Sequence, residues 1–332
     1  MPRPAVKEHH LSLPRLFGII LLFIIACGYA VWKSDRFQGL LHGVSQSRLT
    51  EALGRPVTFN TVEIRIFPPT VLLANVRIGN DPRLPGALLT VEEVSIGGGM
   101  SIGGGELRLG RIRALRPRAV LTQLPDGSWN LPPGLSGPSK GGLKLAIGSV
   151  LVQEGVLDLQ GRKIGIDGSL ENFTAELVSL VKDRYRGSLD ARRATLRLPD
   201  AEPIVTSFST RFALDAVRGL TIEDANLAGA FGKLAVNGSL ETAARTDAVF
   251  TAAGDVSIEE IERIFHSELG FSGPASINAR ISVPPAGGFR ITAAVAAPRV
   301  RTTQFTFENF AATIAARPET LTARIDRADY AG

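Results

Sequence analysis

Hydrophobic and polar residues alternate with a period of two along most of the chain beyond residue 55. The clearest stretch is FRITAAVAA, in which Phe289, Ile291 and Val295 fall on one side and Arg290 and Thr292 on the other. Because successive side chains of a strand point to opposite faces, this pattern predicts strands with one apolar face. Similar strands are expected at residues 70–78, 88–96, 119–124, 143–153, 156–159, 208–214 and 234–240.

The alternation reverses its phase at residues 59–62, 91–94, 109–112 and 307–310. A shift of one residue moves every following side chain to the other face of a strand. Repeated reversals therefore predict β-bulges, or strands that bend sharply.

Two segments have a helical period instead. Residues 35–53 carry an apolar stripe, followed by Gly54 as a stop signal and then by Pro56. This amphipathic helix would either close the end of the sheet or lie on a membrane surface. Residues 257–265, SIEEIERIF, form the second predicted helix, with Ser257 as its N-cap and Glu260 at the capping-box position.

Residues 16–32 form an unbroken apolar run between Arg15 and Lys33. A helix needs about 17 to 25 such residues to cross a bilayer, so the run predicts a transmembrane anchor. The preceding tail has three basic residues and one acidic residue, a surplus of 3 − 1 = +2, which places the N-terminus in the cytoplasm. Side chains spaced along the predicted anchor are Leu16, Ile20, Phe23, Ile25, Tyr29 and Trp32.

Two other interpretations of this run stay open. A signal peptide cleaved between Ala26 and Ala30 would remove the run, although the apolar stretch continues to Trp32. The sequence IIAC, which ends at Cys27, also resembles the lipobox of bacterial lipoproteins. In that case Cys27 would be lipidated after cleavage.

Composition is consistent with a folded, exported protein. Cys27 is the single cysteine in 332 residues, so the part beyond the anchor can form no disulfide. With 44% hydrophobic and 21% charged residues, the chain can bury a core of its own. The net charge of +5 suits a membrane with anionic headgroups. The 37 basic and 32 acidic residues form no block of one sign, which argues against nucleic acid as a partner.

Motifs that carry chemistry are weak. Past the anchor the only histidines are His42 and His266, and neither has the spacing of a metal site. The glycines at 97–99 and 103–105 are not followed by Gly-Lys-Ser/Thr, so turns are expected there. No Gly-x-Ser-x-Gly motif is present. We therefore expect no enzyme activity, no catalytic or metal-binding residues and no cofactor.

These patterns divide the chain into six parts. They are a cytoplasmic tail (1–15), an anchor (16–33), an amphipathic helix (34–54), a first β region (55–131), a Pro- and Gly-rich linker (132–142) and a second β region (143–332). The second region contains the helix near 257–266. The chain stops at DYAG in the middle of a strand pattern, so this region is expected to be incomplete.

The order of several segments resembles the AsmA family of Gram-negative bacteria. The matching pieces are LGRPV, VEIRIFPPTVLLANVRIGND, LRLGRIRALRPRAVLTQLPDGSWNL and LKLAIGSVLVQEGVLDL, within residues 13–160. The segment IGGGMSIGGG at 96–105 departs from the leucine-rich sequence that is usual in the family. The family belongs to the AsmA-like superfamily, together with the TamB and YhdP families.

The resemblance implies a protein of the bacterial inner membrane whose bulk lies in the periplasm. It also implies an elongated, twisted antiparallel sheet, either groove-like, taco-shaped or an open sandwich, that passes phospholipid toward the outer membrane. The inward candidates from the alternation are Ile64, Ile66, Leu121, Leu145, Ile147, Phe208, Phe212, Leu214, Phe289, Ile291 and Val295.

Two alternatives to the open groove remain at this point. The apolar faces could close on each other as an ordinary β-sandwich, because large exposed apolar patches are rare on soluble proteins. The chain could also be a non-catalytic assembly factor whose strand edges pair with outer-membrane proteins as they insert. Phospholipid, the inner membrane and outer-membrane assembly or lipid-handling proteins are thus the expected partners.

Overall fold

The computed structural model describes most of the chain beyond residue 45. The described residues are 46–47, 49–51, 53–65, 67, 69–103, 106–132, 144–162, 165–181, 184–215, 218–241, 247–267, 270–284, 289–317 and 320–331. The predicted tail and anchor lie outside them, as does nearly all of the predicted linker. Among the described residues, no helix combines the length and the apolar character that a membrane crossing requires.

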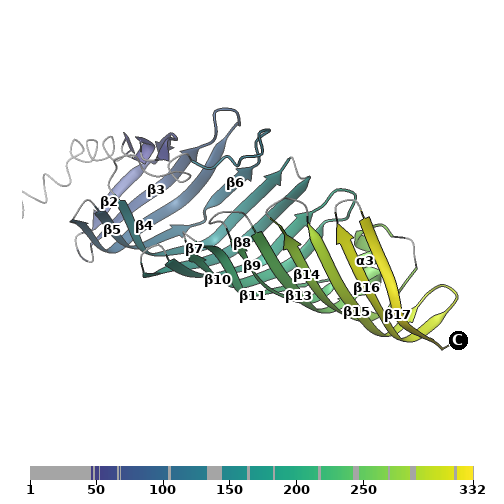
Figure 1. Ribbon diagram of the computed structural model, residues 1–332. Helices are drawn as coiled ribbons and strands as arrows, with labels where there is room; N and C mark the ends of the chain where they lie inside the picture. The colour runs from purple at the N-terminus through teal and green to yellow at the C-terminus, as the bar shows by residue number, and fades with distance from the viewer. Residues whose placement is uncertain are drawn as a thin grey trace, which may run out of the picture.

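The described part is mainly β, which confirms the predicted fold class at that level. Seventeen strands form one large, mostly antiparallel sheet that extends from β2 at one end to β17 at the other (Figure 1). Their bounds are β1 Val57–Thr58, β2 Thr61–Arg65, β3 Thr70–Gly79, β4 Ala87–Gly103, β5 Glu106–Leu115, β6 Arg118–Thr122, β7 Lys144–Gly161, β8 Ile166–Val181, β9 Arg184–Arg197, β10 Ile204–Asp215, β11 Gly219–Gly229, β12 Gly232–Glu241, β13 Asp247–Ser257, β14 Pro274–Val283, β15 Arg290–Arg301, β16 Thr306–Arg317 and β17 Thr320–Tyr330.

From β7 onward each strand pairs with the next one in the chain, as in a long meander. The first part is less regular. Strands β1 and β2 both pair with β3, and β5 and β6 follow one another along the same edge of β7. The chain returns between β6 and β7, so β7 runs parallel to both. The sheet is therefore antiparallel except for these two pairings.

Two details of the predicted strands need correction. Residues 144–161 form one strand, β7, where two were expected, because the reversal near Gly155 is a bulge within a continuous strand. Residues Gly97–Gly99 lie inside β4 and do not form a turn. Their register with β5 shifts between Gly97 and Met100, so these glycines take part in a bulge.

Most of the predicted phase reversals occur at irregularities of the sheet. The register of β16 with β17 shifts between Glu308 and Ala311, and Asn309 there has a φ of 50°. The reversal at 91–94 lies opposite Asn75, which has a φ of 54°. The reversal at 59–62 separates β1 from β2. These irregularities let the segments on either side keep their apolar side chains on the same face.

Both predicted helices are present where the structure describes them. Residues 46–47, 49–51 and 53 are helical, and Gly54 ends this helix with a φ of 63°. Helix α3 spans Ile258–Ile264, and the Ser257 hydroxyl accepts a hydrogen bond from the Glu260 amide at 3.2 Å. The Ser257 amide itself donates to the Phe231 carbonyl, so only half of the predicted capping box forms.

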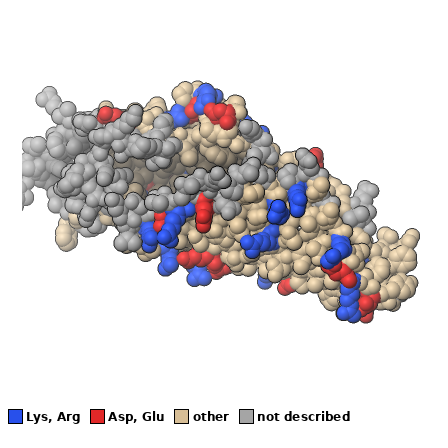
Figure 2. All heavy atoms as spheres, viewed as in Figure 1, with Lys and Arg blue, Asp and Glu red and all other residues tan. Residues whose placement is uncertain are grey.

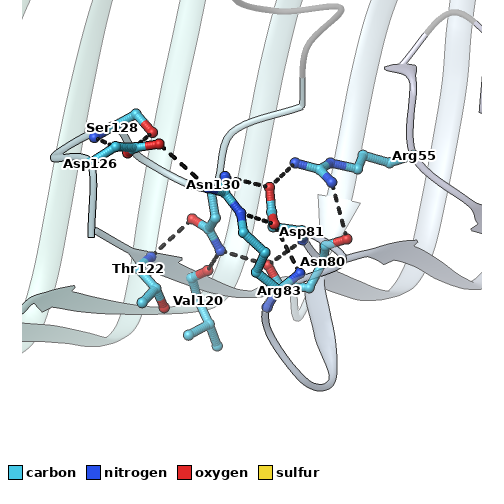
Figure 3. A network of polar contacts seen from close by, with 9 residues as sticks. All are labelled: Arg55, Asn80, Asp81, Arg83, Val120, Thr122, Asp126, Ser128 and Asn130. Atoms are coloured by element: carbon cyan, nitrogen blue, oxygen red, sulfur yellow. Dashed lines mark hydrogen bonds and ion pairs between the residues drawn. The ribbon is translucent and has the colours of Figure 1, made fainter. Parts of the chain in front are cut away.

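A buried polar network holds the loops at the β3 end of the sheet together (Figure 3). Arg55, Asp81 and Asn130 are all buried, and the Asn130 side chain has no exposed surface. The Asn130 amide group donates to the Asn80 side chain at 2.8 Å and to the Val120 carbonyl at 3.0 Å. Its oxygen accepts from the Thr122 amide at 2.9 Å. One side chain thus joins the loop after β3 to strand β6.

The charged half of this network centres on Asp81. Its carboxylate accepts from the side chain of Arg83 at 2.8 Å and from that of Arg55 at 2.9 Å. Hydrogen bonds from the Arg83 side chain, then from the Arg83 amide and then from Arg55, hold the pKa of Asp81 far below its usual range. The network depends on Asp81 being ionised.

Loss of the Asp81 charge is expected to destabilise the fold in acid. The unfolded carboxyl has a pKa near 3.9 and the folded one lies lower, so the contribution is complete above about pH 4 and declines below it. The unfolding temperature of the wild-type protein should therefore exceed that of Asp81→Asn at neutral pH, and the gap should narrow between about pH 4.5 and 2.5. Asp190→Asn, at an exposed site on β9, is the control. A gap independent of pH would contradict the assignment.

Candidate functional site on the apolar face of the sheet

One row of apolar residues crosses the whole sheet through its register pairs. We call it the long row. Each member lies directly opposite the next on the neighbouring strand, so their side chains share one face. From β2 to β17 its members are Ile64, Val71, Ile96, Ile112, Val150, Leu177, Gly187, Phe212, Ile222, Gly238, Phe250, Ile281, Ile291, Ala316 and Leu321.

A second row, the short row, runs beside the first on the same face. It extends from β8 to β17 through Phe173, Ala191, Phe208, Leu227, Leu234, Gly254, Ile277, Val295, Ala312 and Ile325. Neither row contains a polar side chain. Together they define what we call the apolar face.

The opposite face is polar. Positions between the members of the long row include Thr221, Ser239, Ser282 and Arg290, which point away from the apolar face because side chains alternate. On the surface visible in Figure 2, Lys, Arg, Asp and Glu of the described residues form small mixed groups without a large patch of one sign. The two rows of the apolar face contain no charged residue, as the alternation in the sequence predicted.

The large side chains of the long row remain half-exposed. Apart from Gly187, every member whose burial is described is only half-buried, from Ile64 on β2 to Ala316 on β16. In a β-sandwich the same positions would be buried between two sheets. No second layer in the described part of the chain covers this row.

Full burial of apolar residues is concentrated in two clusters. The first contains Val57, Phe59, Leu73, Val76 and Val91, with Leu53 from the preceding helix packed against it. Beyond these clusters the buried apolar residues are mainly alanines, among them Ala225, Ala279 and Ala293. Small side chains of this kind are shaded by larger neighbours on their own face, so their burial does not require a covering layer.

Helix α3 forms the second cluster. Its Ile264 packs with Phe231, Val256, Ala275, Ala297 and Val300, and partly exposed members of the short row such as Leu234 and Val295 adjoin them. No member of the long row belongs to this cluster. Helix α3 therefore covers one margin of the apolar face and leaves its centre open.

Three phenylalanine rings lie over glycines on adjacent strands. A methyl group in place of the Gly155, Gly187 or Gly238 hydrogen would overlap the rings of Phe173, Phe212 and Phe250, respectively. Because glycine has no side chain, a large ring on the neighbouring strand can pack directly against the backbone of the sheet. The glycines thus keep these rings flat against the sheet.

The structure places most of the predicted inward residues on the apolar face. Ile64, Phe212 and Ile291 belong to the long row, and Phe208 and Val295 to the short row. Leu214 is paired with Tyr185 and Leu220 on the same face. Leu121 pairs with Leu159 on β7 and Ile147 with Leu109 on β5, and neither belongs to the long row or the short row.

For the remaining candidates the structure gives only a position in the chain or no description. Leu145 lies in β7 opposite Leu107, and Phe289 precedes β15 with 41% of its surface exposed. Ile66 lies outside the described residues, as do the anchor residues Leu16, Ile20, Phe23, Ile25, Tyr29 and Trp32.

Sequence reasoning missed several members of the long row, including Phe250 and Leu177. Strand β13 reads DAVFTAAGDVS, where alanines occupy both faces and weaken the alternation. The available indication of an apolar face in β13 was Phe250, which lies two residues from both Ala248 and Ala252. Within the described residues, no group of His, Cys, Asp and Glu could hold a metal ion.

No family model, curated protein or solved structure matches the chain.

A substitution at Gly187 tests the packing of the apolar face. In Gly187→Ala the new methyl group would meet the Phe212 ring and also the Glu176 carbonyl oxygen at 2.8 Å. We expect a loss of stability of about 1 to 3 kcal/mol, measured by chemical denaturation.

Gly168→Ala on the adjacent strand β8 is the matched control, because the nearest atom to its methyl group would be the Thr195 carbonyl oxygen at 3.6 Å. Equal stability of the two variants would contradict the packing described for Phe212.

Proposed function

We propose that the protein binds phospholipid acyl chains along the apolar face and passes them from the inner toward the outer membrane, as an AsmA-like periplasmic protein. The observation that carries the proposal is the long row, which is unbroken across fifteen strands and in which every member of described burial except Gly187 is only half-buried. Soluble proteins rarely expose continuous apolar surface on this scale. A ligand with long hydrocarbon chains would cover it.

The dimensions and energies suit this ligand. With about 4.8 Å between strands, the long row extends for about 65 to 70 Å. Each buried methylene group contributes about 0.8 kcal/mol, so a chain of about sixteen carbons could gain on the order of 10 kcal/mol. Because every position on the path is similar, a chain could slide without a large barrier at any one strand.

An open groove explains the burial better than a closed sandwich does. In a sandwich, Phe212, Ile281 and Ile291 would be buried by a facing sheet, whereas each is half-exposed. The strands in Figure 1 curve as they cross the molecule, and α3 lies along one margin of the apolar face. We therefore assign the apolar face to the inside of a groove with headgroups at its rim.

The cellular location in this proposal depends on the sequence. The apolar run at 16–32 would anchor the protein in the inner membrane with its N-terminus in the cytoplasm, and the sheet would lie in the periplasm. The AsmA-like order of segments between residues 13 and 160 supports the same arrangement. The proposed activity is transport and involves no catalysis.

Lipid retained by the purified full chain tests this function. We expect solvent extraction and mass spectrometry to recover phospholipid from the wild-type protein. The variant Ile222→Lys/Ile281→Lys places two charges in the long row, and we expect it to retain at least fivefold less.

The control Thr221→Lys/Ser282→Lys carries the same charges on the polar face and should retain a wild-type amount. Circular dichroism would verify that both variants fold. Absence of phospholipid from wild-type protein, or equal loss in both variants, would refute the proposal.

A second candidate function is the assembly of outer-membrane proteins by strand pairing. Strand β17 pairs with β16, and its described residues are exposed, Ile325 by 65%. No described strand pairs with the other edge of β17. If this edge pairs with client strands, proline substitutions along β17 would lower outer-membrane protein levels and leave lipid composition unchanged. The opposite result would favour lipid transport.

A further inference from the structure

An arginine-lined depression lies on the polar face, opposite the apolar rows. It has a volume of about 650 Å³ and lies over β5 to β9. Arg113, Arg116, Arg118 and Arg192 line it, together with Gln153 and Glu154. Arg113 lies between Ile112 and Ala114 of the apolar face, so its side chain points to the other side of the sheet. The depression is therefore separate from the proposed lipid path.

The charges in this depression are not balanced. Arg116 binds Glu154 at 2.9 Å and Glu92 at 2.8 Å, and Arg113 donates to the neutral Gln153 at 2.6 Å. With both glutamates counted against the four arginines, the formal surplus is 4 − 2 = +2. Within the described residues, Arg118 and Arg192 have neither an ion-pair partner nor a hydrogen bond from the guanidinium group.

The shape of the depression follows from a line of irregular residues. Arg116, Glu154 and Asn172 have φ values of 49°, 54° and 51°, which residues other than glycine adopt infrequently. They come from the β5–β6 junction, β7 and β8, which are adjacent in the sheet. Bulges on adjacent strands redirect side chains and hollow the surface locally. The arginines therefore converge on a fixed site that a flat sheet would not provide.

We propose that this depression is a binding site for phosphate groups. Guanidinium groups form paired hydrogen bonds with the oxygens of phosphate, and two of them here have no partner in the part of the chain that the structure describes. Gln153 and Thr174 add neutral polar groups that a multi-oxygen ligand can use. The phosphate could belong to a free phosphorylated solute or to the headgroup of an anionic phospholipid, since the recognition chemistry is the same.

Calorimetric titration of the full-length protein in detergent, at low ionic strength, tests the site with two probes. Inorganic pyrophosphate represents a free phosphate, and glycerophosphoglycerol represents the headgroup of phosphatidylglycerol. We expect at least one probe to bind, and Arg118→Gln/Arg192→Gln to weaken that binding at least tenfold.

Arg280→Gln/Arg301→Gln is the matched control, because both arginines are exposed and, among the described residues, neither guanidinium has a partner. It should leave the dissociation constant within twofold of the wild-type value.

The two probes also identify the source of the phosphate. Binding of glycerophosphoglycerol would assign the site to a lipid headgroup, and binding of pyrophosphate alone to a free solute. If neither probe binds, or if the control weakens binding as much as the test variant, the proposal is wrong. The test is independent of the proposed transport, because neither probe carries an acyl chain and so neither can bind in place of lipid along the apolar face.

Discussion

The structure depends on one constraint: each strand must present its apolar side chains to the same face over the full length of the sheet. Strand pairing transmits this constraint, because a residue fixes the orientation of its partner on the next strand. The long row shows the result, since it passes through fifteen strands without a polar side chain. A slip of one residue on any strand would interrupt it. Bulges near Gly155 and Asn309, and the positive φ of Asn75, preserve the shared face where strands bend.

Large buried side chains are concentrated in two clusters, and the rest of the sheet packs along its own surface. The cluster around Val57 and Phe59 and the cluster under α3 bury large side chains, and the network around Asp81 and Asn130 fixes the loops beside β3. Between them, alanines and phenylalanine–glycine pairs pack along a single layer. This arrangement leaves the larger aliphatic side chains accessible, as a surface for hydrocarbon chains would require.

Much of the fold could be predicted from the alternation, but the connections could not. Strong alternation located β15, and the cap at Ser257 located α3. The alternation in β13 was too weak to assign Phe250 to a face, because alanine and glycine are compatible with either face. The parallel pairing of β7 arises from a return of the chain, which leaves no periodic pattern. The contacts among Arg55, Asn80 and Asn130 could not be predicted for another reason. These residues are distant in the sequence, and each residue type is also common in loops. The sequence segments that contain these residues resemble the AsmA family, but they did not predict the hydrogen bonds between them.

Photo-crosslinking in intact bacterial cells tests the central claim most directly. A benzophenone side chain would be placed at Ile222, Phe250 and Ile281 of the long row, and at Thr221, Ser239 and Ser282 on the polar face. The account predicts phospholipid adducts at the first three positions and none at the other three. Adducts at neither set, or at both sets equally, would contradict an acyl-chain path along the apolar face.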